Sequence, residues 1–258
     1  MREAHLRAIV CFGSPLGRSI FAAMGQKKLL RFNQLRALPN VFEYPKDMAG
    51  TWHSVFGNTH PLLLELACGR GEYTIGLAEQ FPDQNVMGLD VKGNRMYLGA
   101  RYAAEKPLPN VRFLRTQIEM ITDYFLPGEV AELWITFPDP QLRTSRAKKR
   151  LTHPRFLRLY QQILQPGGLI HLKTDSPVLY DFTLHVIKRH QLILHSCSHD
   201  VYAQPTIDPR LRIQTHYEKL DIAQSNRIHY ICFSLTGDLK NDDDQLQKYL
   251  KQHEQTTL

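Results

Sequence analysis

An aspartate between two prolines, followed by a dense run of cations, is the part of the sequence best suited to chemistry. Residues 134–151 read WITFPDPQLRTSRAKKRL. Pro138 fixes its own φ and Pro140 keeps the residue before it out of the helical region, so Asp139 stands on a loop with little backbone freedom. An acid held beside a block of positive charge suggests a reaction centre next to a polyanion. A strand that ends in a solvated turn is an equally good interpretation of this stretch alone.

The cations after this loop are close enough in sequence to form one basic surface. They are Arg143, Arg146, Lys148, Lys149 and Arg150. Neutralisation of phosphates by such side chains supplies most of the sequence-independent affinity for nucleic acids. The whole chain has the same sign, since its 32 Lys and Arg outnumber its 25 Asp and Glu, and its isoelectric point is ≈ 9.2. The clustering, more than the modest net charge, favours an acidic partner.

Two glycines and an acid further upstream form the pattern of a nucleotide pocket. In LLLELACGRGEYTIGLAEQF, Gly69 and Gly71 follow a strand-like run and precede a helix-like one, so the backbone there can turn tightly and approach a ligand. Asp90 closes the next strand-like run about 20 residues later, where a carboxylate accepts hydrogen bonds from both hydroxyls of a ribose. The pattern predicts an adenosine at the carboxyl ends of the strands.

Glu65 narrows the choice of cofactor. It lies four residues before Gly69, whereas the loops that bind nicotinamide dinucleotides have GxGxxG spacing and face a pyrophosphate. A carboxylate at this point repels pyrophosphate and attracts an ammonium or a sulfonium group, and S-adenosylmethionine carries both. A structural Glu at a strand end is the alternative for this residue. Acids at the tips of two successive strands favour the cofactor.

The elements that must position these residues alternate along the chain. Strands are expected at 62–66, 85–89, 111–114, 133–137, 169–173, 192–196 and 227–234. Helices are expected at 73–80, 93–105, 118–125, 154–164 and 177–189. Strands that alternate with helices over this length predict an α/β fold, in which helices cover both faces of a mainly parallel sheet. The last two strands are joined by a long irregular connection instead, which is typical of a functional or disordered segment.

One domain with extensions is the expected plan, because 258 residues with 43% hydrophobic content can bury one sizeable core. Met24 begins MGQKKLLRF, which resembles a natural start. We therefore expect residues 1–23 to be a disordered upstream extension and residues 24–60 a basic N-terminal arm. The domain itself is expected at 61–237, and residues 238–258 are expected to form a polar tail or a terminal helix.

The cysteines and the hydropathy indicate the compartment of the protein and the partners that it lacks. Cys11, Cys68, Cys197 and Cys232 have no CxxC spacing, which predicts a reduced, cytoplasmic protein. No apolar run is long enough for a membrane span, so no membrane partner is expected. His195, Cys197 and His199 alternate as metal ligands on one strand face would, but no fourth ligand has a recognisable spacing. We expect a chance alternation and no metal.

Five motifs in a fixed order resemble those of the bacterial tRNA (guanine-N7)-methyltransferases. Between Met24 and about Leu235 they read LELACGRG, GLD, FPDP with its basic run, LQPGGLIHLKTD and THYE. The resemblance implies a Rossmann-like class I methyltransferase fold, with a seven-stranded sheet, mostly parallel, whose last strand is antiparallel. It also implies methyl transfer from S-adenosylmethionine to N7 of guanosine 46 in the variable loop of tRNA.

The resemblance also implies roles for single residues. The positions that match cofactor-binding ones are Glu65, Gly69, Gly71, Asp90, Gln117 and Asp139. Gln117 falls where many members have Asp or Asn near the adenine, and an amide can still donate and accept there. Asp139 also matches the active-site acid. Those that match substrate-binding positions are Arg143, Asp175, Thr215, His216, Tyr217 and Glu218.

The cations Arg146, Lys148, Lys149 and Arg150 are expected to grip tRNA phosphates, which gives affinity but little sequence information. Three positions depart from the usual family pattern: Ala67 replaces the first glycine, Gln141 a tryptophan and Arg146 a histidine. Arg143 stands where Lys is usual. These changes keep the charge pattern and leave the detailed nucleotide contacts open.

The chemistry of the implied reaction sets what Asp139 has to do. Guanine N7 already has a free lone pair, so alignment and desolvation matter more than removal of a proton. We expect Asp139 to orient the guanine by accepting hydrogen bonds from its N1–H and exocyclic amine. In KTDSP, Ser176 can cap a helix that has Pro177 at its first position, which leaves Asp175 for the substrate; the alternative is that Asp175 is the cap.

Three other functions remain as alternatives. A methyltransferase that acts on another RNA has the same motifs. A nicotinamide-dependent Rossmann oxidoreductase explains the sheet and Asp90, but not the glycine spacing. A non-catalytic RNA-binding module explains the charge and leaves Glu65 and Asp139 without a role.

Overall fold

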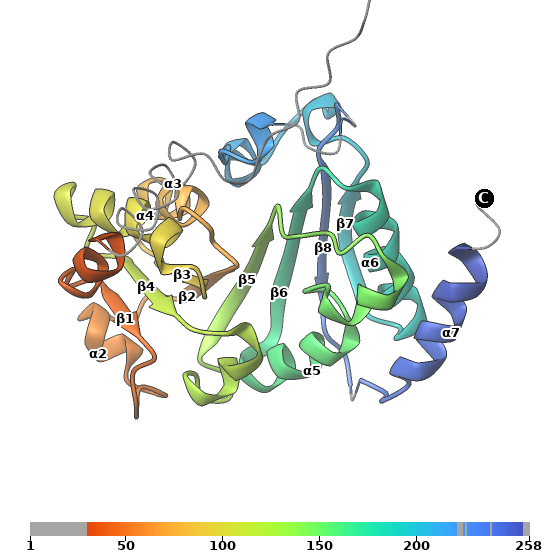
Figure 1. Cartoon of the computed structure of the whole chain (residues 1–258), viewed down its shortest axis with the longest axis horizontal. Coiled ribbons are helices and arrows are strands. Elements are labelled where there is room, and N and C mark those ends of the chain that lie inside the picture. Colours follow the sequence, from red (N-terminus) through yellow and green to blue (C-terminus); the bar gives the residue numbers. More distant parts are fainter. Residues whose placement is uncertain (1–29, 221–223, 225, 238, 255–258) are drawn as a thin grey trace, which may run out of the picture.

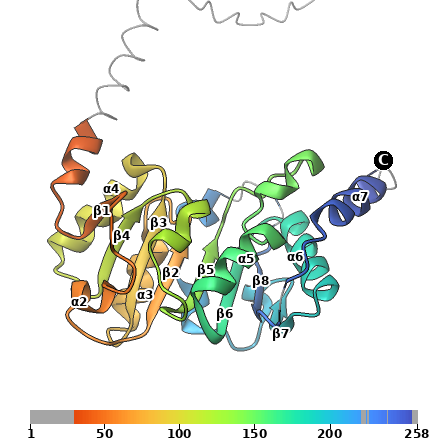
Figure 2. The same cartoon turned by 90° about the horizontal axis from the view of Figure 1, so that it is seen from below.

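One sheet of eight strands runs through the protein, with helices on both faces (Figures 1 and 2). The computed structural model describes residues 30–220, 224, 226–237 and 239–254. The strands are β1 (Val41–Glu43), β2 (Leu62–Leu66), β3 (Asn85–Asp90), β4 (Val111–Arg115), β5 (Val130–Thr136), β6 (Leu164–Thr174), β7 (Ile193–Ser198) and β8 (His229–Ser234). Their order across the sheet is β1-β4-β3-β2-β5-β6-β8-β7.

The expected architecture is confirmed, with one strand added. All seven expected strands are present, and β8 is antiparallel to both of its neighbours while every other pair is parallel. The eighth strand is β1, which pairs its residues 41–43 with 113–115 of β4 at the edge of the sheet. It was not expected because three residues are too few for a recognisable alternation.

The helices are α2 (Trp52–Phe56), α3 (Glu72–Gln80), α4 (Gly93–Glu105), α5 (Pro154–Ile163), α6 (Pro177–Arg189) and α7 (Asp243–Glu254). Four of them, α3 to α6, lie close to ranges expected from the sequence, whereas α2 lies in the expected N-terminal arm and was not expected. The described residues also form five short 3-10 helices: η1 (Ile118–Asp123), η2 (Thr144–Lys149), η3 (Val201–Ala203), η4 (Pro209–Arg212) and η5 (Glu218–Leu220). The helix expected at 118–125 is η1, a 3-10 helix that ends two residues earlier.

Two hydrophobic clusters cover the two faces of the sheet, because successive strand residues point to opposite sides. Leu62, Leu64 and Leu66 of β2 pack with residues of η1, α5 and α6. Leu63, the residue between the first two, packs on the other face with residues of α3 and α4. Burial of β2 on both faces explains why its sequence is a continuous apolar run rather than an alternating one.

The two ends of the described chain are integrated into this core. Trp52, within the expected N-terminal arm, is fully buried, and its Nε1 donates to the carbonyl of Tyr124 at 2.7 Å. The expected polar tail forms α7, in which Leu246 is fully buried. α7 is also held by an ion pair of 2.8 Å between Asp243 and Arg158 of α5. A terminal helix is therefore present, and it is docked on the domain.

Residues 1–23, expected to be an upstream extension, lie outside the described residues. Within the described ranges, no helix has both the length and the apolar character that a membrane span needs.

The close contact between α4 and the glycine loop generates the first prediction. A Cβ atom on Gly99 would lie 2.4 Å from the carbonyl oxygen of Arg70 and 3.2 Å from Cα of Gly71. We expect Gly99→Ala to destabilise the protein by about 1–3 kcal/mol, because backbone must move to admit the methyl group. Urea unfolding measures this. Leu98→Ala, at a partly exposed position of the same helix, is the control. Equal free energies of unfolding for the two variants would contradict the prediction.

Candidate active site

A cavity of ≈ 560 Å³ opens at the carboxyl ends of the central strands. Its lining includes seven of the residues singled out in the sequence: Glu65, Gly69, Asp90, Asp139, Asp175, Thr215 and Tyr217. They come from the ends of β2, β3, β5 and β6 and from the connection between β7 and β8. The parallel strands bring the first five together, since their carboxyl ends meet at one edge of the sheet.

Glu65 is the buried acid of this cavity. Its side chain accepts hydrogen bonds from the backbone N–H of Thr74, at 2.8 Å, and from the hydroxyls of Thr74 and Thr136. Burial raises the pKa of Glu65 from 4.5 to about 7, although the hydrogen bonds from Thr136 and Thr74 act in the opposite direction. A carboxylate buried to this degree is well suited to a cationic ligand, which compensates the lost hydration of the charge.

Asp90 fixes the glycine loop against the end of β3. One carboxylate oxygen accepts from the N–H of Gly69 at 2.9 Å, and the other accepts from the N–H of Lys92 at 2.7 Å. Since each carboxylate oxygen has two lone pairs, both can accept a further hydrogen bond from a ligand. The loop reaches this position through three left-handed residues, with φ of +58° at Ala67, +57° at Gly69 and +75° at Gly71.

Ala67 adopts the left-handed conformation without being glycine. This conformation costs an L-residue about 1–2 kcal/mol, because Cβ approaches the carbonyl oxygen. The surroundings impose the angle, since the next residue, Cys68, donates its N–H to the carbonyl of Leu89 on β3 at 2.9 Å. At this departure from the family pattern, Ala67 thus adopts a left-handed angle that a glycine adopts without this cost.

The loop of Asp139 forms the wall that follows β5. Asp139 is exposed, and one of its oxygens accepts from the N–H of Gln141 at 3.0 Å. Phe137 has φ of +46°, an uncommon angle for a bulky residue, directly before Pro138 and Asp139. The expectation of a conformationally restricted acid is consistent with this turn.

Arg150 departs from the expected surface of phosphate-binding cations. Only 3% of it is exposed, and its guanidinium donates to the carbonyls of Pro140 and Gln141, both at 3.1 Å. It also lies over the ring of Phe182, 4.5 Å from the ring centre. Arg150 thus holds the Asp139 loop on the body of the protein, and the expectation that it faces a phosphate does not fit its burial.

The other four cations of this run lie on or beside η2. Arg143, Arg146, Lys148 and Lys149 are exposed. Lys148 forms a solvent-accessible ion pair of 3.4 Å with Asp244 of α7, whereas no such pair is seen for the other three in the described part of the chain. None of the four lines the cavity, so the basic surface lies next to the cavity and not inside it.

The opposite wall is the segment that reads THYE. Thr215 and Tyr217 line the cavity, and the ring of Tyr217 lies close to the backbone of Gly69 and 5.6 Å from the guanidinium carbon of Arg95. The backbone N–H of His216 donates to a carboxylate oxygen of Glu72, at 2.7 Å. The fourth residue, Glu218, is buried and forms an ion pair of 2.9 Å with Lys173, away from the cavity.

Asp175 follows the end of β6, and Gln117 follows the end of β4. Ser176 caps α6 by accepting from the N–H of Leu179, and Pro177 is the first helical residue, as expected. Asp175 is half-buried and lines the cavity. Gln117 follows β4, is exposed and is not among the residues that line the cavity.

Several residues of the site had no signal in the sequence. Thr136 looked like one more strand residue, and its contact with Glu65 follows only from the register in which β2 and β5 pair. Lys92 and Arg95 bring positive charge to the cavity from the start of α4. Nothing in the spacing of Lys92 and Arg95 marks them as cavity residues, and their place follows from the start of α4 beside Asp90.

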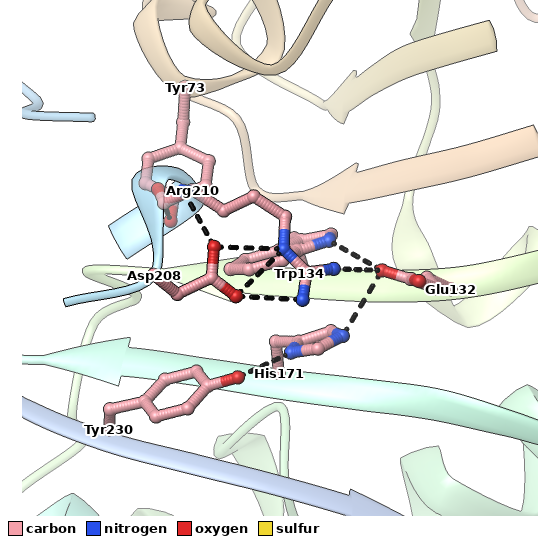
Figure 3. A network of polar contacts seen from close by, with 7 residues as sticks. All are labelled: Tyr73, Glu132, Trp134, His171, Asp208, Arg210 and Tyr230. Atoms are coloured by element: carbon pink, nitrogen blue, oxygen red, sulfur yellow. Dashed lines mark hydrogen bonds and ion pairs between the residues drawn. The ribbon is translucent and has the colours of Figure 1, made fainter. Parts of the chain in front are cut away.

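A second polar cluster joins β5 and β6 to the connection between β7 and β8 (Figure 3), and none of the residues drawn lines the cavity. Arg210 forms ion pairs with Asp208, at 2.8 Å, and with Glu132, at 3.3 Å. His171 lies 3.2 Å from Glu132 and stacks on the ring of Trp134, with ring centres 4.0 Å apart. This cluster fastens the connection between β7 and β8 to the middle of the sheet.

The alternating His195, Cys197 and His199 do not assemble with other ligands. In the described ranges, no group of three His, Cys, Asp or Glu side chains is placed to hold a metal ion. His195 instead exchanges a hydrogen bond of 2.9 Å with the hydroxyl of Ser234 on β8.

Comparison with known proteins agrees with this geometry. The family model described as "putative methyltransferase" matches residues 59–231. Among solved structures, the 16S rRNA methyltransferase KamB superposes with a TM-score of 0.57 at 16% identity, covering 74% of this chain and 96% of that one. An antibiotic-related methyltransferase superposes with a TM-score of 0.54 at 13% identity, covering 72% and 92%. These likenesses concern the fold.

Curated relatives found by sequence share a much higher sequence identity with this chain than these structures do. The tRNA (guanine-N(7)-)-methyltransferase of Bacteroides thetaiotaomicron is 43% identical over 235 residues, which are 87% of this chain and 92% of that protein. The enzyme of the same name from Porphyromonas gingivalis is 44% identical over 213 residues, 78% and 86% of the two chains. Fold and cavity define a methyltransferase with a Rossmann-like sheet. Within that class, the chain belongs to the tRNA (guanine-N7)-methyltransferase family.

The raised pKa of Glu65 generates the second prediction. Because its folded pKa of about 7 exceeds 4.5, the folded state binds more protons than the unfolded state between these values, and stability falls as pH rises through this window. Relative to Glu65→Gln, the wild type should lose up to about 3 kcal/mol of unfolding free energy from pH ~4.5 to pH ~8. Urea titrations across this range measure it, with the exposed Glu105→Gln as control. If the unfolding free energies of wild type and Glu65→Gln differed by the same amount at every pH in this range, the prediction would be wrong.

Proposed function

We propose that the protein transfers a methyl group from S-adenosylmethionine to N7 of guanosine 46 in the variable loop of tRNA. The names of its relatives supply the reaction class. The observation that carries the proposal is the meeting, in one cavity, of a buried acid, a glycine loop and the restricted loop of Asp139, beside exposed cations. Each feature has a separate task in this reaction.

The residues of the cavity fit the cofactor. A volume of ≈ 560 Å³ is in the range of pockets for ligands of this size. Glu65 and Asp90 would hold its ammonium group and its ribose, and Gly69 lets the backbone approach the ligand. Gln117 follows β4 and does not line the cavity, and its side chain would contact the adenine at the edge of the cavity. When bound, S-adenosylmethionine supplies a methyl group on a sulfonium, which is electrophilic.

Asp139 is proposed to position the base. Gln141 occupies one lone pair of one carboxylate oxygen, so the carboxylate can also accept from the N1–H and the exocyclic amine of a guanine. Adenine lacks this pair of donors, so the contact would also select the base. Asp175, Thr215 and Tyr217 line the same cavity and would contact the nucleotide from the other side.

The exposed cations are proposed to bind the backbone of the tRNA. Arg143, Arg146 and Lys149 stand outside the cavity, where they can reach phosphates of an RNA whose target base enters it. His216 would contribute to the same approach from the opposite wall. We place the reaction in the cytoplasm, where cysteines such as the buried Cys68 and Cys232 stay reduced.

Methylation of a defined base tests the proposal. The protein is incubated with labelled S-adenosylmethionine and unmodified tRNA, and the product is mapped at nucleotide resolution. We expect label at N7 of guanosine 46. Label at another position or in another RNA would favour the second candidate, a methyltransferase with a different RNA substrate.

The role of Asp139 gives the third prediction. Asp139→Ala should lower the single-turnover rate by about 10²-fold or more, because the base is no longer aligned. The dissociation constant for S-adenosylmethionine, measured by calorimetry, should change much less. Single-turnover rates equal to those of the wild type would refute the positioning role.

The basic surface gives the fourth prediction. For Arg146→Gln with Lys149→Gln, the slope of log K against log salt for tRNA binding should decrease in magnitude by about 1 for each phosphate that is no longer neutralised. Lys106→Gln, at an exposed position after α4, is the matched control. A double variant with the slope of the wild type would place the phosphates elsewhere.

A further inference from the structure

Lys173 is a fully buried cation in the middle of the protein, near the end of β6. Its ammonium group donates to the carbonyls of Leu211 and Ile213, at 2.8 and 2.9 Å, and to a carboxylate oxygen of Glu218, at 2.9 Å. An ammonium has three N–H donors, so all of them are used. All three acceptors belong to one segment, residues 211–218.

This segment forms a wall of the cavity. Thr215 and Tyr217 face the cavity, while the carbonyls and the carboxylate that Lys173 binds lie behind them. Within the segment, the N–H of Glu218 donates to the hydroxyl of Thr215 at 3.1 Å. Glu218 is held by Lys173 on one carboxylate oxygen and by the hydroxyl of Tyr202 on the other. Lys173 therefore contributes to the position of Thr215 through Glu218.

The main chain of Lys173 holds the opposite wall. Its carbonyl accepts from the N–H of Phe137 at 2.9 Å, and its ammonium lies 5.6 Å from the centre of the Phe137 ring. Phe137 is the left-handed residue that leads into Pro138 and Asp139. One residue thus contacts both the start of the Asp139 loop and the segment of Thr215 and Tyr217.

The residues directly before this segment are fastened separately. Arg210 is bound to Asp208 and Glu132, and its carbonyl accepts from the hydroxyl of Tyr73 at 2.6 Å (Figure 3). These contacts remain if Lys173 is replaced. What Lys173 adds is therefore the position of residues 211–218 beyond this anchor.

The energetics of the pair also favour a geometric role. Burial lowers the pKa of Lys173, and the nearby Glu218 acts in the opposite direction. A buried ion pair adds little net stability compared with apolar residues of similar volume, because both charges lose their hydration. Three fixed donors in a defined direction are what an apolar side chain at this position would not provide.

We propose that Lys173 is a positioning residue that sets the width of the slot between the Asp139 loop and the wall of Thr215 and Tyr217, where the base is received. It acts through the backbone of residues 211–218 and through Glu218, and it does not touch the reacting atoms. The identity of the base rests on the proposed function, whereas the geometry of the slot does not.

Kinetics of three variants test the proposal. Lys173→Met should lower kcat/KM for tRNA by about 10²-fold, because a displacement of the wall misaligns the base, while the dissociation constant for S-adenosylmethionine changes by less than about threefold. In Glu218→Gln, Lys173 still donates to the carbonyls of Leu211 and Ile213, so kcat/KM for tRNA should fall by less than about tenfold. Arg101→Met, which removes the cation of an exposed ion pair on α4, is the control.

The double variant Lys173→Met with Glu218→Gln separates positioning from stability. It leaves no buried charge unpaired, so its unfolding midpoint in urea should return toward that of the wild type. Its kcat/KM should stay low, because the carbonyls of Leu211 and Ile213 still lack a donor. If activity returns together with stability, or if Lys173→Met is as active as the wild type, the proposal is overturned. If Lys173→Met does not fold, the double variant carries the test.

A readout without RNA keeps this proposal distinct from the proposed function. Arg212 and Lys219 are exposed trypsin sites at the two ends of the segment. Cleavage at these sites should be faster in Lys173→Met and in the double variant than in the wild type, since the segment is released. Unchanged cleavage would overturn the proposal. Absence of tRNA methylation by the wild type would instead overturn the proposed function and leave this result standing.

Discussion

The geometry of the candidate active site depends on the burial of one carboxylate. Glu65 ends up below the surface because it lies in a strand that is covered on both faces, and it is accommodated there only because three donors surround it. Two of them come from Thr74 on α3 and one from Thr136 at the end of β5. The acid therefore joins a strand, a helix and a neighbouring strand at the point where the cavity opens. Any change in their relative position would leave a buried acceptor unsatisfied.

The walls of the cavity are held by cations that face inward. Arg150 binds the carbonyls of the loop with Asp139, and Lys173 binds those of the segment with Tyr217. Irregular backbone cannot satisfy its own carbonyls as a helix or a sheet does, so buried donors must come from side chains. A long cationic side chain that starts in regular structure can supply several donors at once. Part of the positive charge in the sequence is used in this way, inside the protein.

The sequence predicted the strand ends well and the partners of charged groups poorly. Central strands such as β2, β3 and β8 could be recognised because burial on both faces requires apolar runs. Glu65 and Asp90 stand out as acids at the ends of two of them. Arg150 looked like its neighbours, since nothing local distinguishes a buried cation from an exposed one. The pairing of Glu218 with Lys173 joins residues 45 positions apart, and no periodicity encodes it. The loop conformations around Phe137 and Gln141 likewise depend on tertiary contacts.

Ala67 has a consequence for how such proteins are recognised. The glycine-rich motif describes a path of the chain, and at this position the path survives without the glycine. A sequence filter that demands every glycine of the motif would discard this chain, although Ala67 adopts the left-handed angle that a glycine favours. A filter built on the two acids and their distances from the loop would keep it. For loops of this kind, the residues that fix the backbone from outside are a safer signature than the residues that make the turn easy.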